Sequence, residues 1–255
     1  MNASMEEIFD FDNLVTENLL ADMKAVIGYA ISHSPRSLQV ALGPSEIGHP
    51  CPRRIGFGLM GAPAVAPQFD PLPSAVGTGA HLWFAKSFEM DNQRLGRDRW
   101  LIEHRVSAWP GMEGNLDLFD SDTGTVIDHK FLGKDAIKRA AGRRGPKSVY
   151  QMQGQTYGAA LAATGREVRA VAIWLLPRGG LIADSVLWSV PFDPAVAQRL
   201  EQRYVTLVGL CADLDVEHHP ERYQLIPAST EDCSFCAWKT ARPVVGAHCI
   251  PGQVQ

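Results

Sequence analysis

The chain has 255 residues, 45% hydrophobic and 20% charged, with a net charge of −4, which suits one large domain or a domain with a small appendage. This balance excludes a globally basic protein, so any nucleic-acid contact has to come from a local patch. No apolar run approaches the roughly 18 residues of a membrane span, and the acidic start lacks the basic region of a signal peptide, so we expect a cytoplasmic protein without membrane contact.

The five cysteines are an odd number, and in a reducing compartment they argue against a disulfide framework. Metal binding, catalysis and core packing remain open for them. The chain also contains no Gly-x4-Gly-Lys-[Ser/Thr] phosphate loop and therefore no recognisable ATP motor.

The N-terminal part is predicted to be helical. Apolar residues recur with a helical period over residues 4–32, which indicates a long amphipathic helix. A loop rich in Gly and Pro carries Cys51 and enters a second helix near Pro52. Arg53 and Arg54 flank that helix start, where an anion is favoured. A single loop cysteine is more often structural than metal-bound.

The next predicted elements are a surface loop, a helix and a strand. Residues 62–73 are rich in Pro and Ala, and Gly77 opens a helix that runs to about Arg94 and carries His81. A lone helical histidine is more often a packed or surface residue than a ligand. Residues 99–107 follow as a strand; Glu89 and Glu103 nearby are expected to be solvated.

Residues 114–130 predict a β-hairpin, since both arms alternate apolar and polar side chains around the turn Asp-Ser-Asp-Thr-Gly. If the turn is centred on residues 122 and 123, partners have numbers that sum to 245, and Asp117 faces Asp128. Side chains two apart share a strand face, so Lys130 joins Asp128 while His129 turns away.

Two carboxylates and an ammonium on one face are costly unless a cation or solvent relieves the repulsion. A hard divalent ion such as Mg²⁺ or Mn²⁺ takes carboxylate oxygens and supports phosphodiester hydrolysis, with a lysine beside the attacking water. The open alternative is an exposed hairpin with solvated charges.

A basic segment and a helix follow the hairpin. Gly142, Gly145 and Pro146 predict a loop over residues 134–147 that could track phosphates, or alternatively a solvated helix end. Its basic residues are Lys134, Lys138, Arg139, Arg143, Arg144 and Lys147.

The helix predicted over residues 148–164 places Gln153 and Tyr157 on one face. An amide and a phenol there can bond phosphates and stack on a base. Strands over residues 167–176 and 181–190 and a helix from about 194 to 216 complete the core.

The C-terminal part contains Cys233, Cys236 and, after a longer gap, Cys249. With Cys51 they provide four thiolates, enough for one [4Fe–4S] cluster or one tetrahedral Zn²⁺. His248 is a weaker substitute for the last cysteine. The fifth cysteine, Cys211, lies in an apolar helical segment and is expected in the core.

Gly-x-x-Asp followed by apolar-Asp-x-Lys resembles the core of the PD-(D/E)XK nuclease superfamily. Gly-x-x-x-His, Gln-x-x-x-Tyr, Ser…Cys-Pro-Arg and the split cysteine set resemble its RecB-like iron–sulfur exonuclease branch, known from CRISPR and bacteriophage systems. The motifs appear in the family's order over nearly the whole chain, although Cys249 follows Cys236 at a longer distance than usual.

The resemblance implies an α/β fold with a restriction-endonuclease-like core, in which helices flank a central mixed sheet. Three parts of one composite domain are expected: a helical N-terminal region with the first cluster cysteine over residues 1–62, the nuclease core over 74–217, and a cluster-binding segment over 218–255.

The resemblance also implies roles for individual residues. One or two Mg²⁺ or Mn²⁺ ions are expected on His81, Asp117, Asp128 and the backbone carbonyl of His129. Lys130 assists the attacking water, and Gln153 and Tyr157 lie beside the site. A [4Fe–4S] cluster is expected on Cys51, Cys233, Cys236 and Cys249, with zinc as the alternative. DNA contacts are expected from Arg53, Arg54 and the basic segment.

The resulting hypothesis is a metal-dependent exonuclease on single-stranded DNA, with a partner in phage recombination or CRISPR adaptation. Two other classes stay open. One is a DNA-binding iron–sulfur subunit with a vestigial nuclease site, and the other is a cluster or zinc protein that serves as a scaffold.

Overall fold

A computed structural model describes residues 13–33, 42–65, 70, 72–233, 236–240, 248 and 249. By their contacts, residues 1–39 and 70–75 form one unit and residues 40–69 and 76–255 another. The first unit contains helix α2, Asn13–Ser32, and the start of α5, Leu72–Leu95. The helix predicted over residues 4–32 is therefore present from residue 13, and residues 4–12 lie outside the described part.

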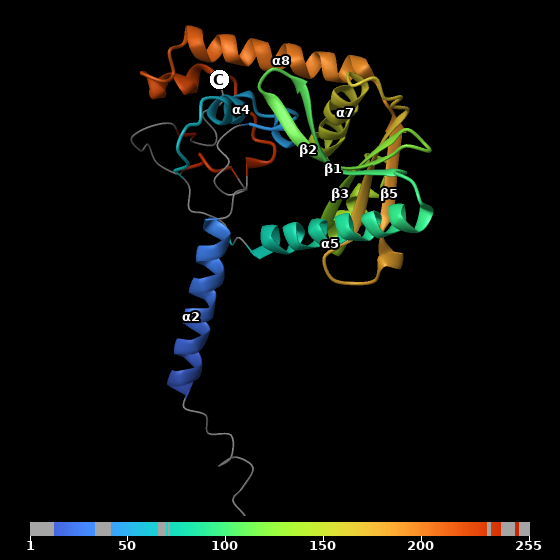
Figure 1. Ribbon diagram of the computed structural model, residues 1–255. Helices are drawn as coiled ribbons and strands as arrows, with labels where there is room; N and C mark the ends of the chain where they lie inside the picture. Colours follow the sequence, from blue (N-terminus) through green and yellow to red (C-terminus); the bar gives the residue numbers. More distant parts are fainter. Residues whose placement is uncertain are drawn as a thin grey trace, which may run out of the picture. The chain divides into compact units, whose positions relative to one another are not determined.

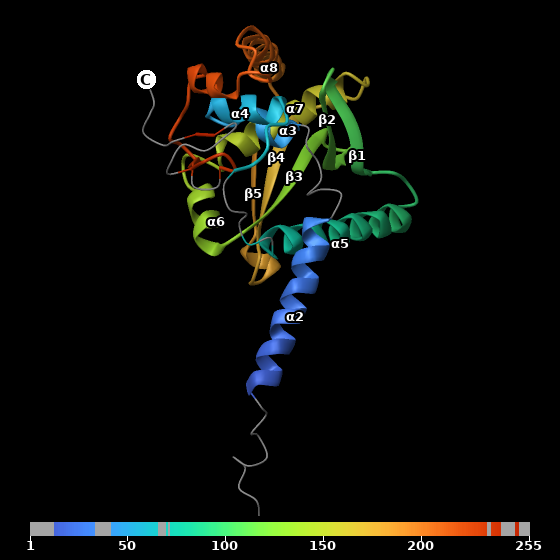
Figure 2. The same cartoon turned by 90° about the vertical axis from the view of Figure 1, so that its left-hand side faces the viewer.

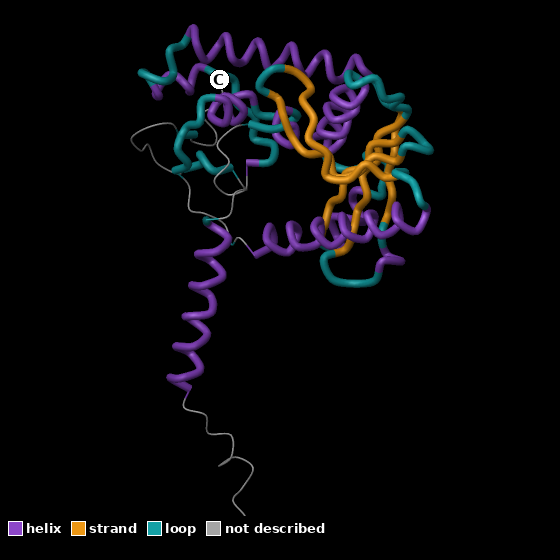
Figure 3. Tube along the Cα trace, in the orientation of Figure 1, coloured by secondary structure: helices purple, strands orange, loops and turns teal. Residues whose placement is uncertain are grey.

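The core of the second unit is one five-stranded sheet with strands in the order β1-β2-β3-β4-β5. Pairing is antiparallel except between β3 and β4, which are parallel, so the sheet is mixed. Figure 3 shows the strands with helices around them, which confirms the predicted α/β fold with a mixed central sheet. The strands are β1, Trp100–Trp109; β2, Met112–Asp120; β3, Thr125–Leu132; β4, Ala170–Pro177; and β5, Val186–Pro191.

The hairpin of β2 and β3 has the predicted register. Leu118 pairs with Ile127, and Asp120 pairs with Thr125, so that partner numbers sum to 245. Gly124 closes the turn with a left-handed φ of +67°, and a β-carbon there would lie 2.9 Å from the carbonyl oxygen of Glu167. Glycine is therefore required at this position.

Different helices cover the two faces of the sheet. Helix α7, Ser148–Ala162, packs Tyr157 and Leu161 on residues of β1, β2 and β3 that include Phe119 and Val126. On the other face, α5 places Phe84 against the rings of His129 and Trp174. The alternation along β3 therefore directs Asp128 and Lys130 toward α7 and His129 toward α5.

Helix α7 lies very close to the sheet because it has glycine where it meets β4 and Phe192, the residue that follows β5. A β-carbon at Gly154 would clash with Val171, and one at Gly158 would lie 2.7 Å from a ring carbon of Phe192. Both distances are shorter than normal packing allows, so the helix can approach the sheet to this depth only without side chains at these positions.

Smaller helices and α8 complete the unit, and Figures 1 and 2 show α8 beside α4 and α7. The prediction of a loop over residues 134–147 was wrong for its first half. Residues 134–140 form helix α6 because Ile137 and Ala140 bury an apolar face against Ile173 and Leu175. The remaining elements are α3, Pro44–Ile47; α4, Pro52–Leu59; the 3₁₀ turns Ile182–Asp184 and Pro220–Leu225; and α8, Pro194–Asp213. No helix within the described residues is long and apolar enough to cross a membrane.

The end of β2 holds an ion pair with a buried carboxylate, and the loss of this pair should be measurable. Asp120 is 4% exposed and accepts two hydrogen bonds from Arg99, at 2.9 and 3.0 Å, and one from Thr123. Asp120→Asn is expected to lower the free energy of unfolding by about 1.5–3 kcal/mol, as for hydrogen bonds to charged groups. Urea denaturation at pH 7 measures this loss, and Asp122→Asn, which removes an exposed carboxylate, should cost much less.

The same variant should change how stability depends on pH. Burial raises the pKa of Asp120, but hydrogen bonds from Arg99 and Thr123 outweigh it and hold the pKa below its usual value. A carboxylate with a lowered pKa stabilises the fold above its unfolded pKa, and this contribution is lost as the pH falls through the folded pKa. Asp120→Asn should therefore lose less stability than the wild type between neutral and acidic pH; an identical loss would contradict this.

Candidate active site and cysteine cavity

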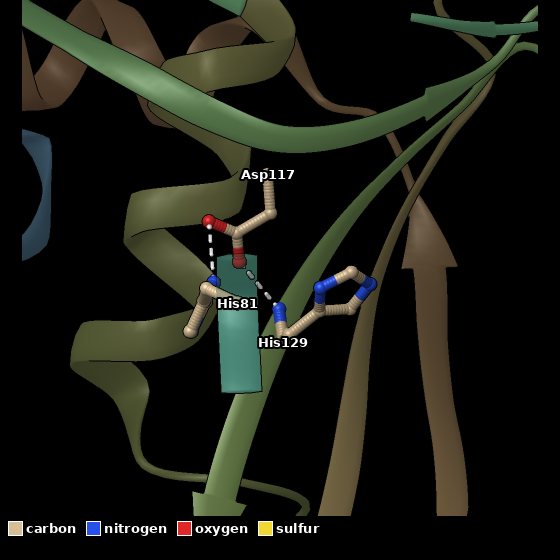
Figure 4. Close-up of side chains that lie close together, drawn as sticks. All are labelled: His81, Asp117 and His129. Atoms are coloured by element: carbon tan, nitrogen blue, oxygen red, sulfur yellow. Dashed lines mark hydrogen bonds and ion pairs between the residues drawn. The ribbon is translucent and has the colours of Figure 1, made fainter. Parts of the chain in front are cut away.

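The first candidate site lies where α5 meets strands β2 and β3 (Figure 4). His81 of α5 places Nδ1 3.3 Å from Oδ1 of Asp117 on β2. The other oxygen of Asp117, Oδ2, accepts a hydrogen bond of 2.7 Å from the backbone N–H of His129 on β3. The carboxylate of Asp117 thus connects α5 to β3. Asp117 bonds to β3 through its side chain, one residue beyond the last backbone pair of the hairpin, Leu118 with Ile127.

His81, Asp117 and His129 together could hold a metal ion, since one ligand atom from each lies within 4.8 Å of the others. The ring of His129 is 3% exposed, its centroid lies 5.8 Å from that of His81, and its Nε2 has no hydrogen-bond partner among the described residues. Only the backbone carbonyl of His129 was expected to take part. The ring of His129 is an additional candidate ligand. Strand alternation alone could not indicate this, because alternation does not show that α5 and His81 cover the face of the sheet on which His129 lies.

Asp128 and Lys130 form a buried pair on the α7 side of β3. Asp128 is 1% exposed, and its Oδ2 lies 2.8 Å from Nζ of Lys130. Lys130 also donates a hydrogen bond of 3.0 Å to Oε1 of Gln153 on α7. Tyr157, one helical turn further on, is buried and bonds to Gln153. The predicted residues Asp128, Lys130, Gln153 and Tyr157 therefore form one connected network.

The carboxylate of Asp128 suits a cation. Burial raises its pKa to about 6; Lys130 opposes this rise, and the charge of Asp117 adds to it. Apart from the contact with Lys130, its two oxygens have no hydrogen-bond partner within the described ranges. A buried carboxylate with unused lone pairs and a raised pKa is the group whose charge a hard divalent ion would stabilise.

The surrounding charges support the same arrangement. Burial alone would raise the pKa of Asp117, but its hydrogen bond with His81 and the nearby charges of His81 and Lys130 together outweigh this and lower the pKa. The same contact raises the pKa of His81 although burial opposes the rise. The pKa of Lys130 would fall through burial but is raised by the charges of Asp128 and Asp117. Lys130 therefore stays protonated, and its Nζ can donate hydrogen bonds at the site formed by Asp128 and Gln153.

Glu103 lies near this site, and its side chain is 39% exposed, as the sequence suggested. Its carboxylate lies 4.0 Å from Nδ1 of His81, and its backbone has a left-handed φ of +43° within β1. Such a conformation is strained for a side chain other than glycine and often marks functional positions. Its neighbours Ile102 and His104 pair with Leu118 and Leu116, which places Glu103 level with Asp117. That relation depends on a strand register that the sequence of β1 does not reveal.

The second candidate site is a cavity lined by the four cysteines of the predicted cluster set. Cys51 precedes α4, and Cys233, Cys236 and Cys249 come from the C-terminal part, nearly two hundred residues away in the chain. The cavity is lined by His49, Cys51, Arg54, Phe57, Cys233, Cys236, Lys239 and Cys249. The backbone of Cys249 bonds to Trp238 and Thr240, which holds it beside the Cys-x-x-Cys segment despite the long gap in sequence. The fifth cysteine, Cys211, is 1% exposed in the apolar core, as predicted.

The assignment of Arg53 to DNA binding was wrong. Arg53 is 3% exposed, and its guanidinium donates to the backbone oxygens of Ile226 and Gln224, to Oε1 of Gln224, and to Sγ of Cys249 at 3.6 Å. A buried guanidinium must have its N–H groups paired. Those of Arg53 donate to groups inside the protein, so they are not available to contact DNA. Arg54 instead lines the cysteine cavity.

The other basic residues predicted to contact DNA are exposed. Lys147 donates a hydrogen bond of 2.7 Å to Asp232, next to Cys233, so the basic loop is linked to the cysteine segment. The exposed residues on and after α6 are Lys134, Lys138, Arg139, Arg143, Arg144 and Lys147.

Comparison with known proteins found no matching family model and no matching curated protein. Two solved structures are similar in fold, both of an alkaline exonuclease (LHK-Exo) from Laribacter hongkongensis, one of them in complex with dAMP. They share 12% and 13% sequence identity with this chain, cover 72% of it and 93% of their own chains, and have a TM-score of 0.42. This similarity is too weak to transfer a site, so the functional proposal rests on the residues of this chain.

Proposed function

We propose that the protein is a metal-dependent nuclease that hydrolyses phosphodiester bonds in DNA, and that it acts as an exonuclease on single strands. The observation that carries this proposal is the buried pair of Asp128 and Lys130 near His81 and Asp117. Apart from Lys130, the carboxylate oxygens of Asp128 have no hydrogen-bond partner within the described ranges. Two carboxylates and a lysine so arranged are the components that metal-assisted phosphodiester hydrolysis requires.

In this proposal His81, Asp117 and Asp128 hold one or two Mg²⁺ or Mn²⁺ ions, together with the backbone carbonyl or the ring of His129. When bound, such an ion would activate a water molecule and stabilise charge on the phosphate. Lys130, through its protonated Nζ, would orient the attacking water. Gln153 fixes the position of Nζ through their 3.0 Å hydrogen bond, and Tyr157 supports Gln153.

The exposed basic residues on and after α6 are proposed to track the DNA backbone, because they directly follow the strand that carries Asp128 and Lys130. Each phosphate contact to single-stranded DNA adds about 0.7 to the magnitude of the slope of log K against log salt concentration.

Arg139→Ala should therefore weaken binding of single-stranded DNA and reduce the slope magnitude by about 0.7. Fluorescence anisotropy in EDTA over a range of salt concentrations measures both changes without cleavage. The matched control is Arg199→Ala, which removes an exposed arginine from α8. Equal slopes for Arg139→Ala and the wild type would rule out a phosphate contact at Arg139.

We further propose that Cys51, Cys233, Cys236 and Cys249 bind a [4Fe–4S] cluster, with zinc as the alternative. Tetrahedral zinc with bonds of about 2.3 Å would bring its sulfur ligands to about 3.8 Å from one another. Within the described ranges no three cysteine sulfurs lie within 4.8 Å of one another, so the thiols would have to move closer together to bind zinc. Burial and the neighbouring thiolates raise the pKa of Cys233, and a bound metal would relieve this repulsion.

Degradation of end-labelled single-stranded DNA in Mn²⁺, compared with the same reaction in EDTA, tests the activity. Loss of label in Mn²⁺ alone supports the nuclease, and release of mononucleotides from one end supports an exonuclease and gives its polarity. DNA binding in EDTA without any metal-dependent cleavage would favour a binding subunit with a vestigial site. The resemblance to free-standing family members makes phage recombination or CRISPR adaptation, with a protein partner, the proposed setting.

A further inference from the structure

His49 is a buried histidine in the cysteine cavity that the proposed reaction does not use. It is 6% exposed and lines the cavity together with the four cysteines. Its backbone is held from two sides, because its N–H donates to Glu46 at 2.9 Å and its carbonyl accepts a hydrogen bond of 2.8 Å from Arg203 on α8. The ring is therefore carried by a fixed loop.

The hydrogen bond from Cys51 determines which ring nitrogen of His49 bears the proton. The backbone N–H of Cys51 donates to Nδ1 of His49 at 3.1 Å. A backbone amide can only donate, so Nδ1 must be the unprotonated acceptor, and the neutral ring carries its hydrogen on Nε2. Nε2 is then a donor and cannot be a metal ligand, since a ligand requires the lone pair that this tautomer has replaced with a hydrogen.

The Nε2–H group of His49 lacks an acceptor within the described part of the protein. A buried donor without a partner destabilises the folded state. The other side chains that line the cavity are Phe57, Arg54, Lys239 and the four cysteines. Phe57 accepts no conventional hydrogen bond, and the two cations only donate, so the sulfur atoms are the acceptors that the cavity's side chains offer.

We propose that His49 donates a hydrogen bond from Nε2 to a sulfur of the iron–sulfur cluster that the cysteines bind, and that it thereby raises the reduction potential of the cluster. This inference rests on the proposed cluster. The reduced cluster carries more negative charge than the oxidised one, so a donor to its sulfurs stabilises the reduced form more. His49 is a positioning and tuning residue in this proposal, and it lines the cavity beside the four cysteine ligands.

Two variants separate the two hydrogen bonds of the ring. In His49→Asn the side-chain oxygen can occupy the place of Nδ1 and still accept from Cys51, but the donor at Nε2 is lost. In His49→Gln the amide nitrogen can occupy the place of Nε2, which keeps the donor and loses the acceptor. Anaerobic redox titration, followed by visible absorbance and electron paramagnetic resonance, gives the midpoint potential of each protein, and iron analysis gives the cluster content.

His49→Asn should lower the ratio of reduced to oxidised cluster at fixed potential about tenfold, a shift of about 59 mV for a one-electron couple. His49→Gln should stay close to the wild type. An unchanged potential in His49→Asn, or an equal fall in both variants, would overturn the role of Nε2 while leaving the cluster itself intact. A wild-type protein that contains zinc or no iron would overturn the cluster, and the inference with it.

A measurement on the wild type alone covers the case in which the Asn variant does not take up iron. Electron–nuclear double resonance of the reduced cluster should show two signals. One is from an exchangeable proton and disappears in D₂O, and the other is a weak coupling of the electron spin to the ¹⁵N of labelled histidine. A strong nitrogen coupling of the size expected for direct ligation would overturn the proposal, because His49 would then be a ligand. The absence of both signals would also overturn it.

Discussion

Asp128→Asn should reduce Mn²⁺-dependent cleavage of single-stranded DNA by at least about 10²–10³-fold, the loss expected when one preorganised electrostatic group is removed from an active site. The amide keeps the shape of the carboxylate but removes the charge that is proposed to hold the ion beside Lys130. Cleavage of end-labelled DNA and Mn²⁺ affinity, measured by electron paramagnetic resonance of free Mn²⁺, should fall together.

The control for this prediction is Asp135→Asn, which removes an exposed carboxylate from the first turn of α6 and should leave cleavage unchanged. Circular dichroism and thermal melting confirm that both variants fold. If the Asp128 variant cuts as well as the wild type, the activity belongs to another site or to a contaminant. If the wild type fails to cut but binds Mn²⁺ and DNA, the protein is a binding module.

The second large effect is expected at the cysteine cavity. Anaerobically purified wild type should be brown, with absorbance near ~400 nm and about four irons per chain, and Cys236→Ser should lose most of this iron because a serine oxygen is a poor cluster ligand. Cys236 is 7% exposed and lines the cavity between segments from both ends of the chain, so thermal stability should fall with the metal.

Cys211→Ala provides the matched control, since it also removes a buried thiol but one that lies in the apolar core. It should keep the full iron content even where it lowers stability. If the wild-type protein is colourless and contains one equivalent of zinc, the iron–sulfur cluster is rejected, but the cysteines still form a metal site. Equal iron content in Cys236→Ser and the wild type would remove Cys236 from the ligand set.

Local patterns predicted the hairpin well because its register follows from the turn and from strand alternation. The pairs from Leu118 to Asp120 have the expected partners, and Asp128 and Lys130 share a face as expected. Apart from α6 and the 3₁₀ turns, the helices and strands after the hairpin were also predicted, with ends that differ by a few residues. Such features depend on neighbours in sequence, which a single chain displays directly.

Features that depend on distant segments could not be predicted in the same way. Arg53 looked like a surface cation at a helix start, but its partners Gln224 and Ile226 come from the far end of the chain. The positive φ of Glu103 and the approach of the His129 ring to His81 depend on how β1 and α5 pack on the hairpin. The tautomer of His49 likewise requires the geometry of one hydrogen bond to Cys51.

The close approach of α7 to the sheet implies that two glycines, which carry no functional group, determine whether the proposed active site can form. Gln153 reaches Lys130 only at the depth that Gly154 and Gly158 permit. In a library of random single variants, positions 154 and 158 should therefore rank with the acidic residues in loss of cleavage. The distance between Gln153 and Lys130 in the proposed active site therefore depends on two residues that have no β-carbon.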